Sequence, residues 1–489
     1  MGDNKTSIIG NLFWKFAERI LAQVVSLVVS IVLARLLLPE DYGAISMVTV
    51  FITIANVFVT AGIPSALVQK KDATKEDFST VFYFNFVLSI ILYLVLFIAA
   101  PYIAGFYNFP VLSPVLRLMG VRIIVASINS VQHSYVSRHM MFKKYFWSTL
   151  FGTLFSGVIG VGMAYAGFGV WALAAQYMVN TCIDTIVLFF TVKWRPTLYF
   201  SWKTTKELFR FGWKILFQGL ASTFTVQIKN LIVGKVYSSS DLGYYTKGQQ
   251  FPGLIVTNIN SSISSVMFPA MSNIQEDLYK VKELLRKSVR LSSYIIFPLL
   301  TGLGMVATPF ISLVLTDKWL SCVPYLRLFC VSQGLAVGMV LRHQALTGIG
   351  RSDAFMHEHN ISFAFSILLL VLFYRRSVMA IAICDVISQI AMFFIVMYTS
   401  KRFNHYGYKE QIIDLLPILL GCAVMSIPVY LVGLLPLSNI MMIFLQVVAG
   451  GVTYLLYSII FKVEEFGIVL SLLKKVTSSI AKKNEGKRT

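Results

Sequence analysis

Long apolar runs alternate with short, mostly basic connections along almost the whole chain. A helix needs about twenty apolar residues to cross the hydrocarbon core of a bilayer, and runs of that length recur throughout. The predicted spans lie near residues 11–36, 43–68, 79–102, 113–136, 145–166, 170–192, 211–237, 242–270, 288–314, 322–346, 355–374, 377–400, 411–434 and 438–461. The pattern predicts an all-α polytopic membrane protein with about fourteen transmembrane helices.

Two successive spans in the middle of the chain carry lysines among apolar residues. At about 100° per residue, five polar positions of the first span fall within roughly 80° of one another: Lys214, Gln218, Ser222, Thr225 and Lys229. The second span gathers Lys247, Gln250, Asn258, Ser261 and Ser265 on one face. Ionisable groups at membrane depth are costly and usually face a bundle interior or a wet cavity. The two stripes therefore predict a cationic lumen with an anionic passenger.

Three spans of the first half carry further polar stripes. The first has Arg19 and Gln23 on one face, with Glu18 about 100° away; the others are Arg122, Asn129 and His133, and Gln176, Asn180 and Asp184. Buried amides and hydroxyls also hold helices together, and lysines near helix ends extend to the membrane surface. We favour helix contacts for the stripe of Asp184 and a lumen for the lysine stripes. The remaining candidate lumen residues are Arg19, Gln23, Arg122 and His133.

Composition excludes a soluble globular protein. Of 489 residues 57% are hydrophobic and 13% charged, with a mean hydropathy of +0.73. The net charge of +20 comes largely from clusters between apolar segments, which encode topology rather than nucleic-acid binding. Five cysteines without a C-x-x-C pair indicate neither zinc nor disulfides. His357 and His359 point apart on a helix and do not predict a metal site, and we expect no cofactor.

Basic residues occupy every second loop, and this predicts the orientation. Short cytoplasmic loops hold the excess of Lys and Arg in membrane proteins. Clusters lie near Lys70, Arg138, 193–210, 280–290 and 401–409, and the C-terminal tail is basic as well. Both termini are therefore predicted to be cytoplasmic. Arg375 and Arg376 break the alternation, which leaves open a misplacement of the neighbouring spans.

An internal repeat predicts two related halves. RLLLPEDYG, which ends at Gly43, resembles KVYSSSDLG, which ends at Gly243, and His133 falls opposite His343 at an offset of 210 residues. Parallel repeats of this kind suit alternating access. The predicted parts are a six-helix lobe (1–193), a cytoplasmic linker (194–210), a second six-helix lobe (211–400), two added helices (401–462) and a basic tail (463–489). The tail is expected to lie on the anionic membrane surface.

Several motifs resemble those of a known family. The runs LARLLLPEDYGAISMV, ALVQKKDATKEDFSTVFYFN, GFGVWALAAQ and DLGYYTKGQQFP are similar to the bacterial polysaccharide-transporter (Wzx-type) flippases of the MOP superfamily. The resemblance implies two six-helix bundles with two added helices. It implies a cargo of polyprenyl-diphosphate-linked oligosaccharide for O-antigen (lipopolysaccharide), capsule or exopolysaccharide, moved across a bacterial inner membrane. Of the matching residues, Lys247 and Gln250 are expected to face cargo.

Two other classes remain as alternatives. A MATE-like drug or metabolite antiporter would couple transport to sodium or protons through a lumen carboxylate, for which Glu18 and Asp184 are the early candidates. The excess of cations in the predicted spans favours the flippase. A glycosyltransferase or polymerase would need a catalytic domain, and the short outer loops leave no room for one. We therefore expect a transporter and not an enzyme, with membrane lipid and polysaccharide polymerase machinery as further partners.

Overall fold

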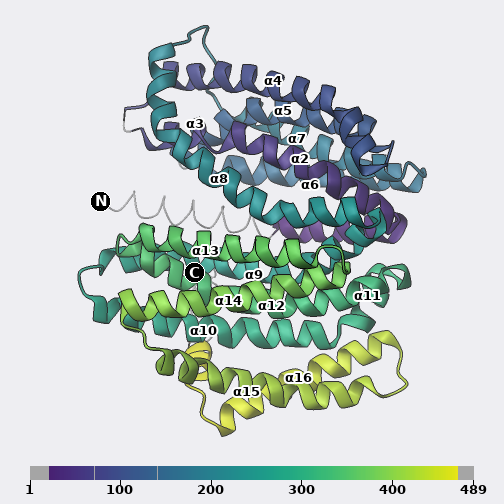
Figure 1. Cartoon of the computed structure of the whole chain (residues 1–489), viewed down its shortest axis with the longest axis vertical. Coiled ribbons are helices and arrows are strands. Elements are labelled where there is room, and N and C mark those ends of the chain that lie inside the picture. Colours follow the sequence, from purple (N-terminus) through teal and green to yellow (C-terminus); the bar gives the residue numbers. More distant parts are fainter. Residues whose placement is uncertain (1–20, 71, 140, 472–489) are drawn as a thin grey trace, which may run out of the picture. The chain divides into compact units, whose positions relative to one another are not determined.

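The computed structural model describes residues 21–70, 72–139 and 141–471, and these form helices joined by short connections (Figure 1). The labelled helices are α2 (Pro39–Thr60), α3 (Ile63–Gln69), α4 (Lys75–Tyr107), α5 (Leu112–Arg138), α6 (Phe142–Tyr165), α7 (Val170–Thr191), α8 (Trp202–Val236), α9 (Ser239–Asn273), α10 (Leu278–Met305), α11 (Ala307–Leu315), η1 (Asp317–Cys322), α12 (Val323–Gly348), α13 (Ser352–Phe373), α14 (Val378–Asn404), α15 (Tyr408–Gly433) and α16 (Asn439–Ile460). The chain is thus a multi-pass, all-α membrane protein, as predicted.

Eleven helical segments of the described residues are long and apolar enough to cross a membrane. The shorter apolar helix Leu21–Leu36 and the two 35-residue helices α8 and α9 occupy the other predicted spans. The polar stripes lower the mean hydropathy of α8 and α9 below that of the eleven apolar segments. The arrangement is consistent with the predicted number of about fourteen.

The boundaries of the spans differ from the prediction in places where the backbone turns. The predicted span 43–68 is divided into α2 and α3 near Gly62, and the predicted span 288–314 is divided into α10 and α11 at Val306. Arg375 and Arg376 lie in the turn between α13 and α14, so the neighbouring spans are placed as the sequence predicted. The predicted linker 194–210 contains the first turns of α8, which begins at Trp202.

The chain divides into two compact units, one up to Thr246 and one from Lys247 onward. In the first unit, α4 packs on α5, α6 packs on α7, and α8 packs on α2 and α3. In the second, α10 packs on α12 and α15, and α15 packs on α16. The lobe boundaries derived from the sequence repeat remain a prediction.

The repeat-related first turns of α2 and α9 meet inside the first unit. A Cβ atom added at Gly43 would lie 1.7 Å from the carbonyl oxygen of Ser239, and one added at Gly243 would lie 2.1 Å from that of Pro39. The hydroxyls of Ser46 and Thr246, also 200 residues apart, are 3.4 Å from each other. The glycines therefore match in the sequence repeat because both are needed where two backbones touch.

Substitution of Gly43 by Ala should lower the stability of the protein, because overpacking against backbone costs about 1–3 kcal/mol. Gly105 in α4 provides the matched control, since a Cβ there would meet no atom within 4 Å. In a helix interior, Gly105→Ala should instead be neutral or stabilising by about 0.5–1 kcal/mol. Thermal unfolding of both variants in detergent measures the difference. Equal melting temperatures for the two variants would contradict the close contact.

Ion pairs connect α15 to α10 near the beginning of both helices. Arg286 donates two hydrogen bonds to the buried carboxylate of Asp414, at 2.8 and 2.7 Å, and Lys282 lies 2.8 Å from Glu410. Burial and the adjacent Asp414 raise the pKa of the Tyr406 phenol, which therefore stays protonated and donates to Asp414 at 2.6 Å. The beginning of α15 is thus joined to α10 by a dense polar network.

Candidate functional site

A polar cavity of about 490 Å³ lies in the first unit among α3, α5 and α7. Five residues of the predicted polar stripes line it: Arg122, Asn129, His133, Asn180 and Asp184. Asp184 accepts hydrogen bonds from the Asn129 amide at 2.5 Å and from the Ser148 hydroxyl, and His133 Nε2 lies 3.1 Å from the same carboxylate. The carboxylate is therefore held by side chains of two other helices, α5 and α6.

Helix spacing and small residues create this arrangement. Asn129 and His133 lie one turn apart on α5, so both reach the Asp184 carboxylate on α7. Gly152 of α6 allows the close approach of α7, since a Cβ there would lie 3.1 Å from the carbonyl oxygen of Asn180. Small residues at such contacts are common in membrane helix pairs. The polar stripe of α7 consequently serves both the helix contact and the cavity wall.

Arg122 occupies a separate part of the cavity wall. Its Nε donates to the Thr181 hydroxyl at 2.7 Å, and its guanidinium carbon lies 5.5 Å from the centre of the Tyr177 ring. The group is thus oriented by a hydroxyl and an aromatic face, without a carboxylate in either contact. A guanidinium held in this way retains positive charge and donors for a ligand. The cavity therefore combines the Arg122 cation with the hydrogen-bonded Asp184 carboxylate and several amides and hydroxyls.

The lysine stripe of α8 lies on a face turned away from its packing partners. Glycines form the packed face, where a Cβ at Gly212 would lie 2.8 Å from Gly62 and one at Gly219 would lie 3.1 Å from Val57. At about 100° per residue the centre of the stripe lies about 110° around the helix from these glycines. Lys214 and Gln218 are exposed within the first unit, and Lys229 is half-buried. The helix is continuous over this length, so the predicted stripe is present as one face.

Lys247 and Gln250 of α9 have a different environment, in the second unit. Lys247 is only 3% exposed, its ammonium donates to the Gln250 side chain at 2.9 Å, and it lies 5.8 Å from the centre of the Trp319 ring. Gly248 brings α9 against α12, since a Cβ there would be 2.7 Å from Tyr325. The pair is thus packed against η1 and the start of α12, and its contact with cargo remains a prediction.

Only part of the first predicted stripe lies within the described residues. Gln23 is half-buried in the helix Leu21–Leu36. Arg19 and Glu18 lie outside the described residues. Their roles in the lumen or in coupling remain predictions from the sequence.

A second carboxylate–histidine–hydroxyl cluster, in the second unit, was missed by the reasoning from sequence. His343 Nε2 lies 2.9 Å from Glu358, which is 1% exposed and accepts a hydrogen bond from Thr399. His343 lies 210 residues after His133, and Glu358 lies 210 residues after Ser148. The offset of 210 residues was therefore the signal in the sequence that could have indicated this cluster. It was weak because the carboxylate and the hydroxyl have exchanged helices between the two clusters.

Comparisons with known proteins find a family and relatives named for polysaccharide biosynthesis. Residues 32–324 match the family model described as polysaccharide biosynthesis protein. The succinoglycan biosynthesis transport protein ExoT of Rhizobium meliloti is 26% identical over 71% of this chain and 70% of its own length. The teichuronic acid biosynthesis protein TuaB of Bacillus subtilis is 27% identical over 67% and 68%.

Solved structures share the fold at low sequence identity. The lipid II flippase MurJ in an inward closed conformation has a TM-score of 0.76 at 16% identity, covering 91% of this chain and 98% of MurJ. A multidrug resistance MATE family transporter of the MOP superfamily, in an inward-facing conformation, has a TM-score of 0.59 at 14% identity, covering 78% and 96%. The predicted fold class is confirmed by these matches.

Proposed function

Since the chain belongs to the polysaccharide biosynthesis protein family, we propose that it moves polyprenyl-diphosphate-linked oligosaccharide units from the cytoplasmic to the outer leaflet of a bacterial inner membrane. The units would serve the assembly of O-antigen, capsule or exopolysaccharide. The names of the relatives, which include a succinoglycan transport protein and a teichuronic acid biosynthesis protein, support a polysaccharide precursor as cargo. The protein would act as a transporter rather than as an enzyme, with both termini in the cytoplasm.

The observation that carries this proposal is the lysine stripe on α8. Lys214 and Lys229 lie on a face of the helix that its packing against α2 and α3 leaves uncovered. Ammonium groups at membrane depth usually face a bundle interior or a wet cavity, and a diphosphate supplies several strong acceptor oxygens for them. The stripe would therefore line a lumen and hold the diphosphate during alternating access.

The polar cavity of the first unit would receive the sugar part of the cargo. Amides, hydroxyls and one histidine line it, and these are the groups that hydrogen-bond sugar hydroxyls. Arg122 adds a cation for an acidic sugar or a phosphate. Asp184 would position His133 and Asn129 through the contacts described above, rather than contact the cargo first.

An ion-coupled antiporter is the second candidate, and Asp184 is the observation that favours it. A carboxylate on the wall of a cavity is what cation coupling requires, and the MATE fold is shared. The contacts of Asp184 with Asn129, His133 and Ser148 satisfy both of its oxygens, however, which suits a structural role better.

Deletion of the gene in its own host tests the proposal directly. Lipid-linked oligosaccharide units should accumulate on the cytoplasmic side, and surface polysaccharide should be lost. Wild-type chain supplied in trans should restore export, which controls for effects on neighbouring genes. Normal polysaccharide together with new sensitivity to drugs would contradict the flippase and favour the antiporter. Chemical analysis of the trapped lipid would identify the glycan.

A further inference from the structure

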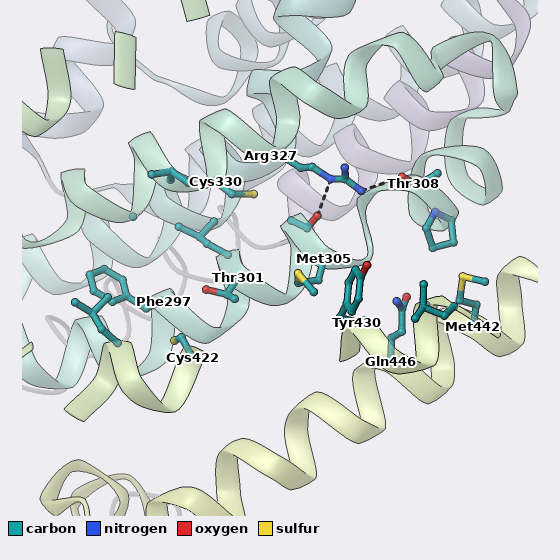
Figure 2. Close-up of a pocket in the computed structure, with 18 of the residues that line it drawn as sticks. Phe297, Thr301, Met305, Thr308, Arg327, Cys330, Cys422, Tyr430, Met442 and Gln446 are labelled. Carbon is teal, nitrogen blue, oxygen red and sulfur yellow. Dashed lines mark hydrogen bonds between the residues drawn. The ribbon is translucent and has the colours of Figure 1, made fainter. Parts of the chain in front are cut away.

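A large apolar cavity lies between α10 and α12 on one side and α15 and α16, the two helices predicted as additions, on the other (Figure 2). Its volume is about 930 Å³. Phe297, Leu300 and Leu335 line one side, and Leu419 and Leu434 line the other. Leu419 of α15 and Val331 of α12 line the cavity within membrane-spanning segments and are exposed, so the cavity opens where the protein meets the hydrocarbon of the membrane.

The cavity lies beside the contacts that join α15 and α16 to α10. The first half of α10 contacts α15 through the ion pairs of Arg286 and Lys282, and Tyr294 contacts α16 through Ser458 at 2.8 Å. Residues of α10 from Phe297 to Met305 line the cavity on one side, while Phe297 and Met305 also pack against the apolar cluster of α15 and α16. Beyond it, Asn439 at the start of α16 donates to Ser312 of α11 at 3.1 Å. The outer halves of these helices thus enclose a space that a hydrocarbon chain would fill.

One cation lies at the rim of this apolar space. Arg327 donates from Nε to the carbonyl oxygen of Gly304 and from a terminal nitrogen to the Thr308 hydroxyl, each at 3.2 Å (Figure 2). Both acceptors are neutral, and the two bonds use two of the five N–H donors of the guanidinium. The group is thereby oriented by backbone and hydroxyl, with its charge uncompensated by these partners.

The position of Arg327 along α12 suits a lipid headgroup. The helix begins at Val323, so Arg327 lies four residues, or about 6 Å of helix rise, from its end. Arginines near the ends of membrane helices reach the headgroup region. A phosphate at Arg327 would therefore leave the attached hydrocarbon chain at the depth of the cavity.

We propose that this cavity binds an anionic membrane phospholipid, with its phosphate at Arg327 and an acyl chain between α10 and α12 on one side and α15 and α16 on the other. The apolar walls fit a chain, and the oriented cation at the rim fits a negative headgroup better than a zwitterionic one. The lipid would hold the outer halves of the added helices in place, as the ion pairs of Arg286 do at the other end. The inference concerns the added helices and does not depend on the cargo.

Native mass spectrometry of the full chain in detergent, with phosphatidylglycerol or phosphatidylethanolamine added, tests the proposal. The wild type should retain phosphatidylglycerol preferentially, and binding should raise its melting temperature. Arg327→Gln should weaken that binding by about tenfold or more, the effect of losing a charge-assisted hydrogen bond. Val331→Trp should reduce it too, because Val331 is an exposed residue of the cavity wall.

Arg117 of α5 supplies the matched control, because it lies 210 residues before Arg327 and donates to the carbonyl oxygen of Phe97 at 3.3 Å. Arg117→Gln should bind phosphatidylglycerol like the wild type. Equal retention of the two phospholipids, or full binding by Arg327→Gln, would overturn the proposal. Displacement of phosphatidylglycerol by an equal concentration of polyprenyl phosphate would assign the cavity to an isoprenoid chain instead. Since none of these measurements involves transport, they remain separate from the test of the proposed function.

Discussion

Replacement of Lys214, Lys229 and Lys247 together by Gln should lower export of lipid-linked oligosaccharide by at least about a hundredfold while the protein still inserts. A hydrogen bond to a charged group contributes about 1.5–3 kcal/mol, and each factor of ten in rate corresponds to about 1.4 kcal/mol. Loss of two such bonds to the diphosphate is therefore enough for the expected effect. The measurement is complementation of a deletion strain, with the amount of inserted protein determined in the same cells.

The two lysines of α8 and the buried Lys247 should be replaced separately as well, because their surroundings differ. Lys214 and Lys229 lie away from the packed face of α8, so the double substitution should leave the fold intact. Lys247 is buried beside Gln250 and Trp319, so its replacement also tests packing. Lys280→Gln is the control for general loss of charge, since that lysine is exposed and paired with Asp277. Normal export by the triple variant would end the idea of a cationic lumen.

A membrane potential alone, without ATP and without obligatory sodium or proton antiport, should bias flipping outward. Moving one charge through about 100 mV is worth roughly 2.3 kcal/mol. A diphosphate with about two negative charges would gain roughly 4–5 kcal/mol in an inside-negative membrane, a bias above about a thousandfold. Lysines that reorient with the cargo would carry positive charge outward and reduce the gain. Flipping in proteoliposomes under an imposed potassium-diffusion potential, at equal pH and sodium on both sides, measures the bias.

The carboxylates decide between this mechanism and ion coupling. Asp184 is held by Asn129, His133 and Ser148, so Asp184→Asn should alter the stability of the cavity wall and leave the dependence on potential unchanged. Glu18→Gln should behave in the same way if Glu18 has a structural role. Transport that ignores the potential, follows a sodium or pH gradient and is abolished by either substitution would place coupling on a carboxylate.

The helical framework followed from the sequence because it depends on local patterns. Apolar runs of bilayer length fix where helices cross, and positions four residues apart must share a face. The stripes of Arg122, Asn129 and His133 and of Lys214 to Lys229 were therefore visible before any coordinates. The repeat ending at Gly43 and Gly243 was visible as well, but the sequence did not show that these glycines lie where two backbones touch.

Contacts between distant segments were decided by the tertiary structure. Asp184 meets His133 across 51 residues, Asp414 meets Arg286 across 128, and Gly43 touches the backbone of Ser239. Periodicity places a residue on a face but does not say which neighbouring helix covers that face. For this reason the burial of Lys247 beside Trp319 could not be predicted from the sequence, and its contact with cargo stays a prediction. The cavity at Arg327 likewise arises from how four helices separate, which no single run of residues encodes.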